Sequence, residues 1–162
     1  MSSDALAGLH QAMHTIDQLR IDIAKQTAKL KQIQSDELKE ILKKVNELIG
    51  ATYWIAATIT ALLEAYYNML LPDADEKKSV EHQITGWKTL LDDLVGKFNG
   101  EIETTIIELG TYVETNKNVI GEEYVTEFEK YAELLKKFEE AFTRFMAELK
   151  KHFEHSSSLN NN

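Results

Sequence analysis

The sequence predicts an all-α fold, an elongated antiparallel four-helix bundle, and three observations support this. The 162-residue chain has one proline, seven glycines and no cysteine, so it offers few tight turns and no disulfides. Apolar residues recur at spacings of three and four along four long segments, as on one face of a helix. A 43% hydrophobic and 28% charged composition suits a soluble domain with a core. We expect one domain over 1–155, with helices at about 4–33, 36–71, 77–115 and 122–154, and a disordered polar tail over 156–162.

The join between the first two segments is the weak point of this topology. Ser35 is a good N-cap for the second helix, with Asp36 and Glu37 in its first turn. However, no glycine or proline marks the join. It can be a short turn, or a skip, meaning a one-residue shift of the apolar register, within one helix of nearly seventy residues. A skip would give a long helical hairpin about Pro72 instead of a bundle. We favour the bundle, because helices are usually far shorter.

The remaining boundaries follow from the helix breakers. Pro72 ends the second helix, because proline cannot continue it and disfavours helical geometry in the preceding residue. The third helix has a bend predicted near Gly100, and its end is predicted at the polar run 116–118, shortly before Gly121. The fourth helix carries an unusually aromatic apolar stripe between 124 and 149.

Charge and motifs exclude several classes of function. The net charge is −9, and it is uneven: residues 1–71 hold eight acidic and seven basic side chains, and residues 72–162 hold 19 and 11. This balance repels phosphate backbones, so we expect no nucleic-acid binding. There is no thiol nucleophile, glycine-rich phosphate loop or Glu-x-x-His motif. We therefore expect no enzymatic activity and no cofactor. The start of the chain lacks the pattern of a secretory signal, which indicates a cytoplasmic protein by default and leaves leaderless or processed export open.

One weak metal-binding pattern is present in the first helix. His10, His14 and Asp17 are spaced so that two imidazoles and a carboxylate can share one helical face, as a zinc site would need. These positions lie beside the apolar stripe, and we interpret them as part of a solvated face. A metal-binding bundle is the third functional hypothesis.

The segment Leu48–Leu71 is the most informative part of the chain, because its twenty-four residues carry a single charge, Glu64. Packing in the core of the bundle explains the apolar residues on the inward face of this segment. Its outer positions are neutral apart from Glu64 and rich in aromatic and small residues. We predict that they bind a partner or lipid: Gly50, Tyr53, Trp54, Ala57, Thr60, Ala61, Glu64 and Tyr67.

Three explanations for this outer face compete. The first helix can pack over it, a protein partner or a second copy can cover it, or it can engage a membrane surface. The sequence favours a non-enzymatic protein-interaction or assembly module. A membrane-active or lipid-binding bundle, in which the apolar helix is exposed conditionally, is the alternative.

Overall fold

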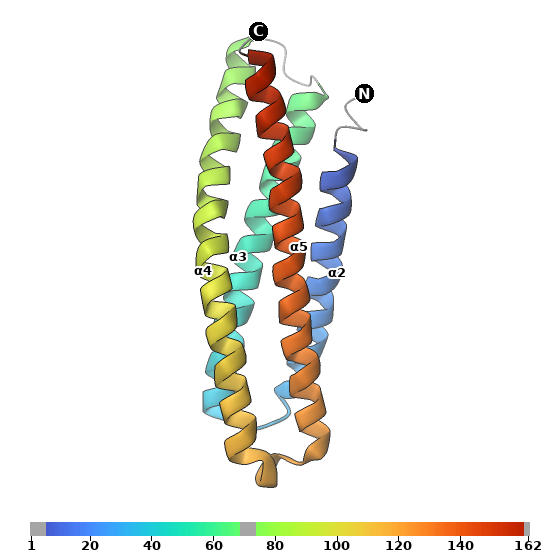
Figure 1. The fold of residues 1–162 in the computed structure, drawn as a ribbon, viewed down its shortest axis with the longest axis vertical. Coiled ribbons are helices and arrows are strands. Elements are labelled where there is room, and N and C mark those ends of the chain that lie inside the picture. Colours follow the sequence, from blue (N-terminus) through green and yellow to red (C-terminus); the bar gives the residue numbers. More distant parts are fainter. Residues whose placement is uncertain (1–5, 69–73, 161–162) are drawn as a thin grey trace.

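The chain folds into four helices that pack side by side as an all-α bundle. The computed structural model describes residues 6–68 and 74–160, with side chains as far as residue 153. The described helices are α2 (Ala7–Leu30), α3 (Asp36–Tyr67), α4 (Ala74–Ile120) and α5 (Glu122–Asn160). Successive helices run in opposite directions, so α2 begins and α5 ends at the same end of the rod (Figure 1). We call this the upper end, as in the figure.

Each helix packs on two neighbours, which gives the bundle a square cross-section. α2 lies between α5 and α3, and α4 lies between α3 and α5. The closest pairs are α2 with α5 and α3 with α4. α4 is the longest helix, and its 47 residues correspond to a rod of about 70 Å at 1.5 Å per residue.

A short turn separates α2 from α3 and confirms the bundle. The chain leaves the helix after Leu30, and the Ser35 side chain accepts a hydrogen bond from the Leu38 amide at 3.2 Å, as expected of an N-cap. Because α2 then packs beside α3, the alternative of one long hairpin is wrong. The proposed breakpoint at Pro72 lies outside the described residues, as do 69–71.

Two of the other predicted boundaries are wrong. α4 continues without a break through Gly100 and ends at Ile120, beyond the end expected at 115. A bend near Gly100 stays a prediction. Asn116 sits inside it and donates a side-chain hydrogen bond to the Tyr112 carbonyl at 2.8 Å. Gly121 alone makes the turn into α5, with a φ of 94° that favours glycine. α5 extends to Asn160, beyond the end expected at 154, so the structure keeps most of the polar tail in the helix.

The core is aliphatic on the side of α2 and α3 and aromatic on the side of α5. α2 contributes one fully buried residue every seventh position, namely Leu9, Ile16, Ile23 and Leu30. Phe98 of α4 packs against the Phe138 and Phe142 rings at centroid distances of 5.4 and 6.0 Å. The aromatic stripe of α5 therefore forms core, as its helical spacing predicts.

Candidate interaction surface

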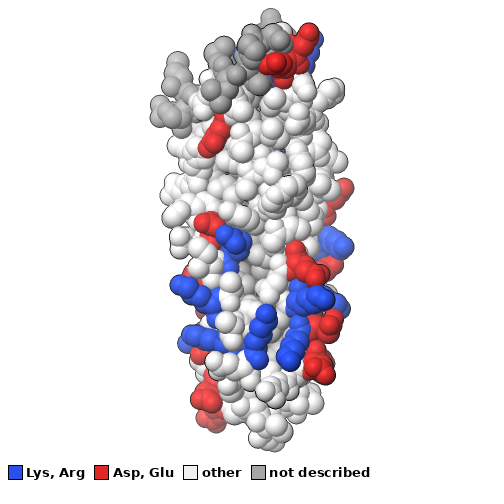
Figure 2. All heavy atoms as spheres, turned by 180° about the vertical axis from the view of Figure 1, so that it is seen from behind, with Lys and Arg blue, Asp and Glu red and all other residues white. Residues whose placement is uncertain are grey.

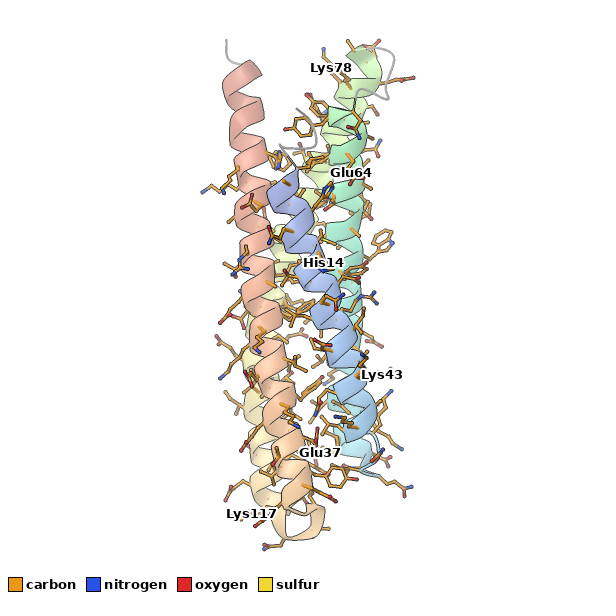
Figure 3. All side chains as sticks on the ribbon, turned by 90° about the vertical axis from the view of Figure 1, so that its right-hand side faces the viewer. His14, Glu37, Lys43, Glu64, Lys78 and Lys117 are labelled. Carbon is orange, nitrogen blue, oxygen red and sulfur yellow. The ribbon has the colours of Figure 1, made fainter. Side chains whose placement is uncertain are left out.

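The predicted face of α3 divides between two flanks of the helix. One flank meets α2, where Glu64 pairs with His10; both side chains are about half exposed. Figure 3 shows Glu64 in the upper half of α3, next to the start of α2. Glu64 therefore has a side-chain partner within the chain.

Two aromatic members of the face are also covered by the chain itself. The Arg20 guanidinium of α2 lies over the Tyr53 ring, 4.3 Å from its centroid. Asp17 accepts a hydrogen bond from Arg20 at 2.8 Å and raises the pKa of the guanidinium. Tyr67 shares a hydrogen bond of 3.2 Å with Nδ1 of His152 in α5. The explanation that the chain covers its own α3 thus holds for this flank.

Thr60 does not belong to the outer face. Its side chain is buried, and its hydroxyl donates to the Ala56 carbonyl one turn earlier at 2.9 Å. A threonine can be buried in the core of a bundle when its hydroxyl forms a hydrogen bond with the preceding helical turn in this way. Its predicted outward position is wrong.

The structure does not gather the three metal candidates into a site. His10 pairs with Glu64, Asp17 pairs with Arg20, and His14 is exposed near Lys137 and Arg144 of α5. Within residues 6–68 and 74–153, no three His, Asp or Glu side chains lie close enough together to hold a metal ion.

The other flank of α3 faces α4 and carries an exposed apolar cluster. Trp54 is 58% exposed and meets Trp87 of α4 edge-on, with ring centroids 5.2 Å apart. Leu90, one turn after Trp87, is 45% exposed. We call these three residues the tryptophan patch. Of the predicted face, Gly50, Trp54 and Ala61 are exposed, and Ala57 is half-buried.

A groove between α3 and α4 continues below the tryptophan patch. It has a volume of about 590 Å³, and its apolar lining includes Leu48 and Ala51 of α3 and Leu94 of α4. Gly100 also lines it, and apart from its own stretch of helix no atom lies within 4 Å of the position that a Cβ would occupy there. The charged residues at the groove have both signs: Lys44, Lys97, Glu47, Glu101 and Glu108.

Charge divides this side of the molecule into two halves. Figure 2 shows an upper half almost without charged side chains and a lower half crowded with lysine, arginine and carboxylate groups. The exposed part of α3 around Trp54 belongs to the segment in which Glu64 is the single charge. An uncharged area with an exposed tryptophan is typical of a binding surface.

Sequence reasoning missed the α4 half of the tryptophan patch. Trp87 falls on the inward stripe of α4 by spacing, but it is only half-buried and lies at the edge facing Trp54. Leu90 falls off that stripe, next to the buried Leu91. An extra apolar residue beside a complete stripe was the signal that could have identified it.

Among the described helices, α3 alone is long and apolar enough to cross a membrane. This observation is weak, because the core helix of a soluble bundle meets the same criterion. The chain matches no protein-family model, no characterised protein and no solved structure in the searches made.

Proposed function

We propose that this protein is a non-enzymatic helical bundle that acts by binding another protein through the tryptophan patch. The observation that carries the proposal is the 58% exposed Trp54, which meets Trp87 edge-on above the groove between α3 and α4. Tryptophan is enriched at protein interfaces, where a large rigid ring can contribute much of the binding energy.

The contacts on the α2 flank of α3 support placing the binding surface on the α4 flank. Tyr53, Glu64 and Tyr67 already contact Arg20, His10 and His152. A partner would have to break these contacts to reach that flank. At the tryptophan patch it needs only to displace water, and the apolar area removed from water then favours binding.

A lipid-binding role for α3 is the second candidate, favoured by the apolarity of this helix. The charges around the groove count against it. Glu47, Glu101 and Glu108 there would be repelled by anionic headgroups, whereas a protein surface can match charges of both signs.

Position-specific photo-crosslinking tests the proposal. In one variant a photoreactive amino acid replaces Trp54. In the control variant it replaces Ile107, which is 68% exposed on α4 away from the tryptophan patch. The protein should form discrete protein adducts in its expressing cell from position 54 and not from position 107. Equal labelling from both positions, or no protein adduct from position 54, would show that the tryptophan patch does not bind a protein.

A further inference from the structure

We draw no further inference here: the strongest candidate, the tryptophan patch with the groove between α3 and α4 below it, belongs to the surface already described, and nothing in the structure shows what covers it.

Discussion

At the scale of single residues, the Tyr131 hydroxyl is a polar group without a partner in the core. It is fully buried, which raises the pKa of the phenol, and no described residue forms a hydrogen bond with it. The neighbouring Thr27 hydroxyl donates its own hydrogen to the Ile23 carbonyl at 2.8 Å. We expect Tyr131→Phe to stabilise the fold by about 1 kcal/mol, since it removes a desolvated hydroxyl. The melting temperature should rise by about 2–4 °C.

Tyr66→Phe is the matched control for this prediction. The Tyr66 hydroxyl donates to Glu81 at 2.8 Å, and burial together with this carboxylate raises the pKa of Tyr66 to about 12. Loss of the bond should lower stability by about 1 kcal/mol, opposite in sign to Tyr131→Phe. If both variants melt below the parent, the Tyr131 hydroxyl has a hydrogen-bond partner after all.

Glu139 makes stability depend on pH. Burial, and next the charges of Glu103 and Glu140, raise the pKa of its carboxyl above the ordinary value. The folded chain thus holds this proton more tightly than the unfolded chain does. The stability from Glu139 is present below the unfolded-state pKa and is lost as pH rises through the folded-state pKa. Thermal melts should show that Glu139→Gln stabilises at pH 7 and has no effect at strongly acidic pH.

The exposed Glu129 on the same helix provides the comparison. Glu129→Gln removes the same charge from the acidic chain without removing a half-buried carboxyl. It should stabilise less than Glu139→Gln at pH 7. Equal gains from both variants would mean that net charge, not the surroundings of Glu139, causes the effect.

At the scale of elements, the turn between α4 and α5 depends on one glycine. Gly121 has a φ of 94°, where a Cβ is strained, so Gly121→Ala should cost about 1–2 kcal/mol. Gly110 lies inside α4, and apart from its own stretch of helix no atom lies within 4 Å of a Cβ position, so Gly110→Ala should stabilise by about 0.8–1 kcal/mol. Urea unfolding measures both. A Gly121→Ala variant as stable as the parent would show that the turn adopts another geometry.

The apolarity of α3 gives a second prediction at this scale. Its apolar stripe packs into the core, so we expect no co-sedimentation with phosphatidylcholine–phosphatidylserine vesicles at pH 7 or pH 5. No dye should leak from loaded vesicles. Binding that is lost in Trp54→Asp would favour the lipid-binding alternative over the protein partner.

At the scale of the whole molecule, periodicity predicts the bundle but not which side of a helix each neighbour covers. The apolar stripes and Ser35 identified four antiparallel helices, because inward positions repeat at fixed spacings. The contacts of His10 with Glu64 and of Tyr67 with His152 join residues more than fifty positions apart, and no local pattern encodes them. The predicted face therefore included residues that the chain itself covers.

The patch was predicted only in part for the same reason. Trp54 stood out because the segment Leu48–Leu71 around it carries a single charge. Trp87 and Leu90 belong to an ordinary amphipathic helix and gain significance only beside Trp54. Helix ends were also missed where polar residues such as Asn116 continue a helix. Tertiary packing overrides such weak local preferences.

Acrylamide quenching of Trp54 over a range of protein concentration is the most direct test of the central claim, that the tryptophan patch is an interaction surface. The chain has two tryptophans, so Trp87→Phe leaves Trp54 as the single emitter while keeping an aromatic ring beside it. We expect Trp54 of the purified chain to be readily quenched in dilute solution, because its ring is 58% exposed. A protected Trp54 with blue-shifted emission at every dilution would mean that the chain covers Trp54 itself, and this result would contradict the account.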